Sequence, residues 1–424
     1  MRIRAIHGIL GAAALAAAAL LAVACGSSSS PSIPNTEDAS SPDTGLVPDT
    51  GADAAACVAD LMNDHANCGR CGRDCGAGST CSAGLCSPTE LGATTTPVTA
   101  LTAGATRVYW EASGVFGCAK TGCGGAPTTL LASSVANGGI DTTTLGDELV
   151  YFTISGSPGH IGRCNPGGTC TDDHVTTDLS HPSRIIATNA DLFFATDLVG
   201  DAGGADASAG DAGDGGDGGS GLSTGGAVLR ASLAGSSQTA SSVVKAESVL
   251  GFAFAGSTLI WTDRTAGVTV CKLPCADPGP IPSAGTGVAA PPSGRPAIAG
   301  GVAFWPTVEG AIVRCSPMSC ASTRDIFLPP SQERVVGDLA SDGMTLYFAQ
   351  VTTTRTSAPT KPSGQIAACP IDAQTCEPSA LASGLPTPNR LAIDGTSAFW
   401  ANGSDSTDGT FTALTGSAVL RVTR

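Results

Sequence analysis

The sequence predicts an all-β protein in which a four-stranded unit is repeated seven times. A short β-branched or aromatic run that ends in Trp or Phe recurs seven times, mostly about 42 to 44 residues apart, and a turn signal such as GDE or SDG precedes it. A second alternating strand, such as GAVLRA or GAIVRC, follows each run. No helical period accompanies these repeats. A fixed period of this length predicts a seven-bladed β-propeller, whereas a β-sandwich with regular turns would not require one.

The aromatic residue that ends each run is expected in the second strand of its blade, where it would fill the blade core. The seven positions are Trp110, Phe152, Phe194, Trp261, Trp305, Phe348 and Trp400. We assign residues 88–424 to the propeller on this basis.

The chain begins with a short basic start and an apolar, alanine-rich stretch that ends at Val23, followed by Ala24 and Cys25. This layout is typical of a secretory signal, and the stretch is too short for a convincing transmembrane helix. The sequence LAVAC, residues 21–25, resembles the lipobox of bacterial lipoproteins. The resemblance implies that residues 1–24 are a lipoprotein signal peptide and that Cys25 is acylated. An ordinary cleaved signal is the alternative.

Residues 25–56 consist mainly of Ser, Pro, Asp, Ala and Gly, with almost no large apolar side chain. Such a segment cannot bury enough surface to order itself. We expect a disordered, lipid-anchored tether that spans roughly 30 Å as a flexible coil.

Residues 57–87 are too rich in cysteine to form a hydrophobic core and are expected to be held together by disulfides. The cysteines of this disulfide-rich module are Cys57, Cys68, Cys71, Cys75, Cys81 and Cys86. The run NCGRCGRDC, residues 67–75, resembles the NCGxCGxxC signature of Stig1-like cysteine-rich modules. A Cys68–Cys71 redox pair or half of a zinc site is the alternative. Six cysteines allow 15 pairings, so the connectivity stays open.

Within the propeller, cysteines occur as close pairs that begin at the end of a third strand. The expected disulfides are Cys118–Cys123, Cys164–Cys170, Cys271–Cys275, Cys315–Cys320 and Cys369–Cys376. Units three and seven have Ala231 and Val422 in place of the first cysteine and also lack the second, which supports the pairing. Each short loop contributes about 2 kcal/mol of stability by loop entropy. Of the 17 cysteines, Cys25 would be acylated and the other sixteen paired.

The end of the chain predicts how the ring closes. Arg424 ends the third strand of unit seven, so a fourth strand must come from elsewhere. Residues near 90–96 resemble the junction between a fourth and a first strand, and we expect them to complete blade seven and remove its exposed edge. The module and the tether would then leave from the face that carries the disulfide turns.

The formal net charge of −15 and a lysine count of four argue against nucleic acid as a partner and against electrostatic binding to anionic lipid. Membrane association would therefore depend on the lipid anchor. The predicted location is the cell envelope, as an outer-membrane lipoprotein facing the periplasm or the exterior.

Three connections between second and third strands are long, and all three belong to the face opposite the disulfide turns. They cover residues 195–225, 349–363 and 401–415. Long loops on a rigid scaffold often bind ligands, and we expect a protein or glycan ligand on this face. The Asp/Gly/Ala segment at about 200–225 is predicted to be disordered, with weak calcium binding as an alternative.

The run LIWTD, residues 259–263, resembles the repeats of YWTD and NHL-type propellers. The resemblance implies a structural role for Trp261 and Asp263, which would tie blades together. It also implies a function in binding proteins or glycans, because most such propellers are not enzymes.

An enzyme is the alternative class. Carboxylates that follow second strands, namely Glu111, Asp197, Asp263 and Glu309, could converge near the channel of a hydrolase or lyase. The sequence has no HExxH motif and no paired metal-ligand spacing. We therefore predict a non-catalytic binding or adhesion module with no catalytic residue, no metal and no cofactor. A purely structural envelope scaffold is the third hypothesis.

Overall fold

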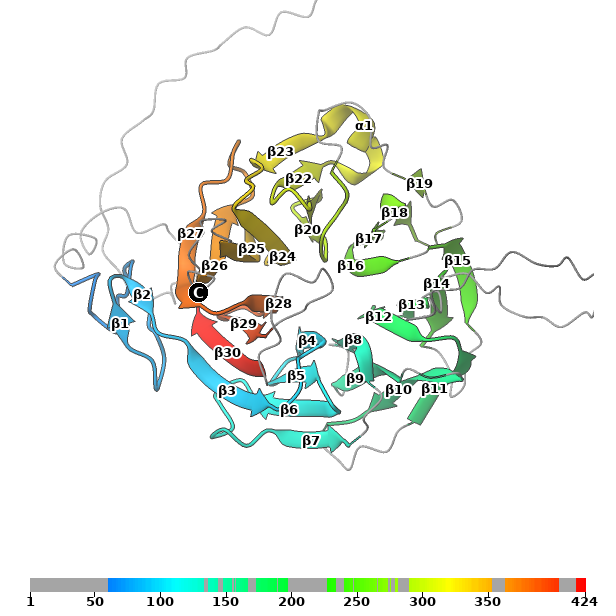
Figure 1. Cartoon of the computed structure of the whole chain (residues 1–424), viewed down its shortest axis with the longest axis horizontal. Coiled ribbons are helices and arrows are strands. Elements are labelled where there is room, and N and C mark those ends of the chain that lie inside the picture. Colours follow the sequence, from blue (N-terminus) through cyan, green and yellow to red (C-terminus); the bar gives the residue numbers. More distant parts are fainter. Residues whose placement is uncertain are drawn as a thin grey trace, which may run out of the picture. The chain divides into compact units, whose positions relative to one another are not determined.

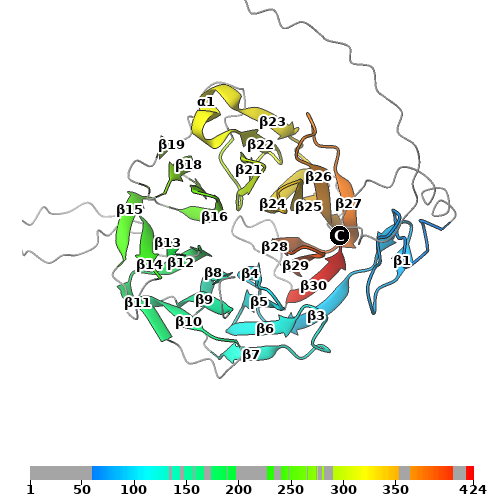
Figure 2. The same ribbon diagram turned by 180° about the vertical axis from the view of Figure 1, so that it is seen from behind.

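The computed structural model describes residues 60–132, 136–143, 148–154, 156, 158–166, 173–188, 190–196, 227–233, 240–246, 248–264, 266–273, 275, 279–280, 290–352, 363–403 and 417–424. The expected signal peptide, Cys25 and the tether lie outside these residues. Within the described residues, seven four-stranded antiparallel sheets follow one another around a ring, which confirms the predicted seven-bladed propeller (Figure 1, and from behind in Figure 2).

The first four blades follow the chain from the innermost strand to the outermost. Blade one contains β4 (Ala100–Ala103), β5 (Arg107–Glu111), β6 (Val115–Ala119) and β7 (Thr128–Leu131). Blade two contains β8 (Ala136–Thr143), β9 (Leu149–Ile154), β10 (Gly159–Cys164) and β11 (Asp173–Leu179). Blade three contains β12 (Pro182–Ala187), β13 (Asp191–Thr196), β14 (Ala227–Ser232) and β15 (Ser241–Lys245). Blade four contains β16 (Val249–Ala255), β17 (Thr258–Asp263), β18 (Gly267–Lys272) and β19 (Gly279–Pro280).

The last three blades continue this order, and the final one takes its outer strand from the N-terminal side. Blade five contains β20 (Ala297–Ala299), β21 (Val302–Pro306), β22 (Ile312–Cys315) and β23 (Asp325–Leu328), with η1 (Pro317–Ser319) and α1 (Cys320–Thr323) between the last two. Blade six contains β24 (Arg334–Ser341), β25 (Thr345–Thr352), β26 (Ser363–Pro370) and β27 (Ser379–Leu385). Blade seven contains β28 (Pro388–Ile393), β29 (Ser397–Asn402), β30 (Ser417–Thr423) and β3 (Thr89–Thr94).

The second strand of each blade supplies most of the core, because its side chains are buried on both faces of the sheet. All six residues of β13 are buried, for example, although the strand includes Asp191 and Thr196. Each of the seven predicted core aromatics is at most 2% exposed. Burying side chains of this size is a major source of stability, at about 25 cal/mol per Å² of apolar surface.

Ring closure by the N-terminal strand is confirmed. β3 pairs antiparallel with β30, from Thr89 opposite Arg421 to Thr94 opposite Ser417. Leu91 of β3 is fully buried. The edge that the third strand of blade seven would otherwise expose is thus covered by the other end of the chain.

Short disulfides clip the turns after third strands. The bonds Cys118–Cys123, Cys271–Cys275, Cys315–Cys320 and Cys369–Cys376 are formed. Cys164 is also disulfide-bonded, and its expected partner Cys170 lies outside the described residues. These bonds indicate an oxidising environment, either extracellular or in the cell envelope.

The cysteine-rich module holds the two-stranded sheet of β1 (Cys81–Ser82) and β2 (Leu85–Cys86). The module packs on the end of β30: Arg73 Nη2 donates to the Thr423 carbonyl at 3.0 Å, and Thr423 Oγ1 donates to the Cys75 carbonyl at 3.1 Å. This is the end of the third strand, at the face that carries the disulfide turns. In the part of the chain that the structure describes, no helix is long and apolar enough to cross a membrane.

Candidate functional site

A cavity of about 170 Å³ opens at the mouth of the central channel. We call it the vestibule; its lining includes Asp338, Val351, Thr387, Arg390 and Gly403. Val351 and Gly403 lie at the ends of the second strands of blades six and seven, where the connections to the third strands begin. The vestibule therefore lies on the face predicted to bind a ligand. Most of the three long connections themselves lies outside the described residues.

Below the vestibule the channel narrows to a cavity of about 40 Å³ that equivalent residues of all seven blades line. In six blades this residue immediately precedes the first-strand residue that faces the core aromatic, as Arg184 precedes Ile185 opposite Phe194, and in blade five Arg295 lies two residues before β20. We call them the ring positions: Ala100, Gly139, Arg184, Gly251, Arg295, Asp338 and Arg390. Three arginines thus converge on the axis of a strongly acidic protein.

Local backbone irregularities present two of these arginines to the channel. The pairing register shifts between Ser183 and Ile185 and again between Asn389 and Leu391, so Arg184 and Arg390 are the extra residues of β-bulges. Their φ angles, +36° and +43°, lie in the left-handed region that residues other than glycine rarely adopt.

Arg295 is held within the ring by close packing. Its Nε donates to the Phe252 carbonyl at 3.2 Å. A Cβ atom on Gly251 would lie 2.8 Å from Cβ and Cγ of Arg295, so this ring position must be glycine for the arginine to fit.

Two carboxylates accompany the arginines. Arg390 Nη1 lies 3.7 Å from Asp338 Oδ1. Asp141, on the inner strand of blade two, accepts hydrogen bonds from Thr102 Oγ1 at 2.9 Å and from the backbone N–H of Ala187 at 2.8 Å. Burial raises the pKa of Asp141, although the positive charge of Arg295 and these hydrogen bonds act in the opposite direction. Asp141 thus connects the inner strands of blades one, two and three.

The ring positions were not among the predicted site residues, although the sequence contains a signal for them. Arg184, Arg295 and Arg390 each stand ten residues before a core aromatic, at 194, 305 and 400. Asp338 stands ten residues before Phe348. Aligning the repeats on their aromatics would therefore have placed these four charges at one level of the channel.

Two of the four candidate carboxylates, Glu111 and Asp263, serve as structural ties. Glu111 is fully buried, and its Oε2 accepts a hydrogen bond from the Gly139 N–H of the next blade at 2.9 Å. Asp263 is also fully buried; it accepts from the Ser248 N–H before β16 at 2.9 Å and from the Ala266 N–H after β17 at 2.8 Å. Glu309 is exposed, and Asp197 lies outside the described residues.

The neighbouring Thr262 supplies the tie between blades that the YWTD-like run implied. Its Oγ1 donates to the Gly294 carbonyl, in the connection to blade five, at 2.8 Å. Trp261 packs in the core of blade four. The LIWTD run therefore fixes both ends of its blade, with Asp263 holding the connection from blade three and Thr262 holding the connection to blade five.

Asp263→Ala is expected to lower the free energy of unfolding by about 2 kcal/mol, because the N–H groups of Ser248 and Ala266 lose their buried, charged acceptor. Glu309→Ala, which removes an exposed carboxylate, should change it by less than about 0.5 kcal/mol. Urea unfolding followed by tryptophan fluorescence measures both. Equal stability of the two variants would contradict a structural role for Asp263.

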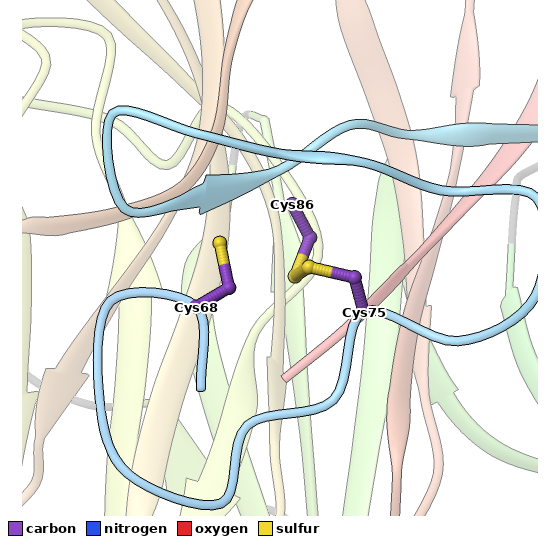
Figure 3. Close-up of side chains that lie close together, drawn as sticks. All are labelled: Cys68, Cys75 and Cys86. Carbon is purple, nitrogen blue, oxygen red and sulfur yellow. A yellow bond between two sulfur atoms is a disulfide. The ribbon is translucent and has the colours of Figure 1, made fainter. Parts of the chain in front are cut away.

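The sulfur atoms of Cys68, Cys75 and Cys86 lie within 4.8 Å of one another, as metal ligands would (Figure 3). Cys75 is bonded to Cys86, however, and Cys68 to Cys81. A metal requires thiolates, so this cluster is a pair of stacked disulfides. The same bonds exclude a Cys68–Cys71 redox or zinc pair in this structure.

Cys71 is exposed and forms no disulfide with a described residue, contrary to the expectation that all sixteen cysteines are paired. Cys57, the sixth cysteine of the module, lies outside the described residues. We therefore predict a Cys57–Cys71 bond in the oxidised protein. Thiol titration of denatured, unreduced residues 26–424 should find no free thiol, and Cys71→Ser should create one. Two free thiols in the unaltered chain would contradict the bond.

The rings of His160 and His174 lie side by side on β10 and β11, with centroids 3.9 Å apart. Cross-strand neighbours of this kind could bind a metal only with further ligands. In the described ranges, the cysteine cluster above is the sole group of three metal-ligating side chains.

No protein-family model and no curated protein matches this chain. Among solved structures, similarity is found to the computationally designed Ika8 protein, with 9% sequence identity, coverage of 79% of this chain and 98% of that chain, and a TM-score of 0.44. The fold assignment above rests on the strand order and pairing of the chain itself.

Proposed function

We propose that the protein is an envelope-anchored, non-catalytic binding module whose ligand, a protein or glycan, enters the vestibule. The observation that carries the proposal is the vestibule itself: a concave, partly polar site at the mouth of the channel, on the face where the long connections begin. Sites of this form, built on a rigid scaffold, are typical of ligand binding.

The anchor would be the acylated Cys25, connected through the tether of residues 25–56 to the module at the opposite face. In this arrangement the anchored side of the propeller carries the disulfide turns, and the vestibule faces away from the membrane. The oxidising environment that the disulfides indicate is consistent with an outer-membrane lipoprotein.

A hydrolase or lyase is less well supported, because Glu111 and Asp263 lie in different blades, and Glu111 accepts one and Asp263 two hydrogen bonds from backbone N–H groups. A catalytic pair would need carboxylates directed together at one open site. A pure scaffold would not require polar and charged side chains inside the channel, where burial is costly.

Binding is tested by thermal unfolding of oxidised residues 26–424 with envelope polysaccharides, peptides and divalent metals. We expect one class to raise the midpoint saturably, because a ligand that binds only the folded state stabilises it. The rise should be lost when Val335, an exposed residue of the vestibule lining, is replaced by Trp, which would obstruct the vestibule. A folded protein whose midpoint no compound changes would favour the scaffold instead.

A further inference from the structure

We propose that the arginines at the ring positions form an oxyanion site, so that the ligand enters the vestibule through a single carboxylate or phosphate group. This inference rests on the proposed binding function and adds the chemical class of the ligand. Arg184 and Arg390 line both the vestibule and the constriction, and Arg295 lies deeper in the channel.

The choice of residue supports the assignment. A guanidinium group presents its donors in a planar fork that matches carboxylate and phosphate oxygens, and it keeps its charge when partly buried. The chain has only 21 basic residues against 36 acidic ones. Three of the 21 nevertheless occupy equivalent places on one axis, and Arg264 adds a fourth at the vestibule.

The fold does not require arginine at these places. The equivalent residues of blades one, two and four are Ala100, Gly139 and Gly251, which complete the same ring with almost no side chain. Arg184 and Arg390 also hold left-handed backbone angles that a glycine would adopt without strain. Strain of this kind costs on the order of 1 kcal/mol per residue and is concentrated at functional sites.

Two described carboxylates, Asp338 and Asp141, lie beside the arginines of the ring. Arg184, Arg295 and Arg390 face Asp338 at the same level, and Asp141 is engaged with Thr102 and Ala187. The 3.7 Å separation of Arg390 and Asp338 is longer than the roughly 2.8 Å of a direct charge-assisted hydrogen bond. Arg390 and Asp338 therefore form no direct charge-assisted hydrogen bond with each other.

A hydroxyl group beside Arg390 completes the site. Thr387 lines the vestibule and is 8% exposed, and its Oγ1 has no hydrogen-bond partner among the described residues. A buried hydroxyl usually has a partner, and a bound oxyanion would provide the acceptor.

The dimensions of the channel set how the ligand enters. The constriction of about 40 Å³ holds only a few water molecules, whereas the vestibule above it is several times larger. A polymer cannot thread through the ring. The site instead suits the acidic end group of a ligand, whether a sugar acid, a peptide C-terminus or a phosphate.

The test uses oxidised residues 26–424 and three small probes: D-glucuronate, inorganic phosphate and, as the uncharged control, D-glucose. Calorimetric titration at low ionic strength should detect glucuronate or phosphate but not glucose, with affinity that falls as salt is added. The tighter of the two anions identifies the source as carboxylate or phosphate.

Arg184→Gln and Arg390→Gln should each weaken anion binding by about tenfold or more, and Arg390→Lys, which keeps the charge but loses the fork, by less. Arg107→Gln removes the same charge from the start of β5, at the disulfide face, and should leave binding unchanged. Thr387→Val should weaken binding severalfold without lowering the unfolding midpoint, which keeps the test decisive if an arginine variant does not fold.

Anion binding that the glutamine and valine variants leave unchanged would overturn the oxyanion site, as would binding of glucose as tight as that of glucuronate. If a neutral compound binds in the vestibule and the arginine variants do not affect it, the oxyanion inference fails while the proposed function stands. If nothing binds the folded protein, both fail.

Discussion

Removal of all residues before 97 is expected to unfold the propeller or cause it to aggregate, whereas removal of all residues before 88 should leave it folded. The two truncations differ only in residues 88–96, which include β3. Loss of β3 removes the fully buried Leu91 and the backbone pairing with β30. At about 2 kcal/mol for the leucine and about 1 kcal/mol for each lost hydrogen bond, the difference in unfolding free energy is roughly 5 kcal/mol or more.

The longer truncation also exposes a strand edge at blade seven, and exposed edges pair with other molecules. Size-exclusion chromatography and thermal unfolding followed by circular dichroism separate the two outcomes. The 88–424 protein serves as the control, because it lacks the module contacts to Thr423 but keeps the closed ring. Equal thermal unfolding midpoints for the two truncated proteins would show that β3 does not stabilise the closed ring.

The sequence predicts the propeller well because a repeat makes each weak local signal count seven times. The core aromatics, the turns before them and the glycines after them agree on one unit, and a single blade read alone would be ambiguous. The paired loss of cysteines in units three and seven predicted the disulfide clips by the same logic. Closure by β3 was predictable because an incomplete last unit and an extra strand at the start complement each other.

The candidate site was less predictable, because its residues form a site only once the fold places them at the same level of the channel. Arg184 or Arg390 in isolation is an ordinary surface-type residue at the start of a strand. The same holds for Glu111 and Asp263: the sequence locates them at the ends of second strands but cannot show that backbone N–H groups donate to both side chains. The pairing of the module cysteines depends on three-dimensional proximity and could not be deduced.

Blade seven, built from both ends of the chain, is also tied to its neighbours by two equivalent ion pairs. Asp342 and Asp394 occupy the same turn, after the first strands of blades six and seven, and each accepts backbone N–H groups two and three residues later. Arg424, just after β30, pairs with Asp342. Lys120, just after β6 of blade one, pairs with Asp394 at 2.7 Å.

Both aspartates keep their charge to unusually low pH. Burial raises the pKa of Asp394, but the bonds from Lys120, Thr396 and Ser397 outweigh it, so that the pKa lies below its ordinary value of 3.8. For Asp342, burial is likewise outweighed by Met344, Thr345, Tyr347 and Arg424, and the pKa is lowered. Such groups stabilise the folded state above their unfolded pKa, and the contribution disappears as pH falls through the folded pKa.

The double variant Asp342→Asn with Asp394→Asn should therefore be about 3 kcal/mol less stable than the unaltered protein at pH 7, since it loses two charge-assisted networks. The two proteins should converge as pH falls through the lowered folded-state pKa of Asp342 and Asp394, where the aspartates of the unaltered protein become protonated. Urea unfolding at a series of pH values measures the difference in unfolding free energy. Asp141 has a raised pKa, so its protonation changes stability in the opposite sense, but this contribution is the same in both proteins and cancels from the difference. Asp325→Asn, which removes an exposed partner of Arg314 within blade five, is the matched control and should cost less than about 1 kcal/mol at any pH. A difference that persists unchanged at pH 2 would show that the asparagines act through packing and that the charges do not hold blade seven in the ring.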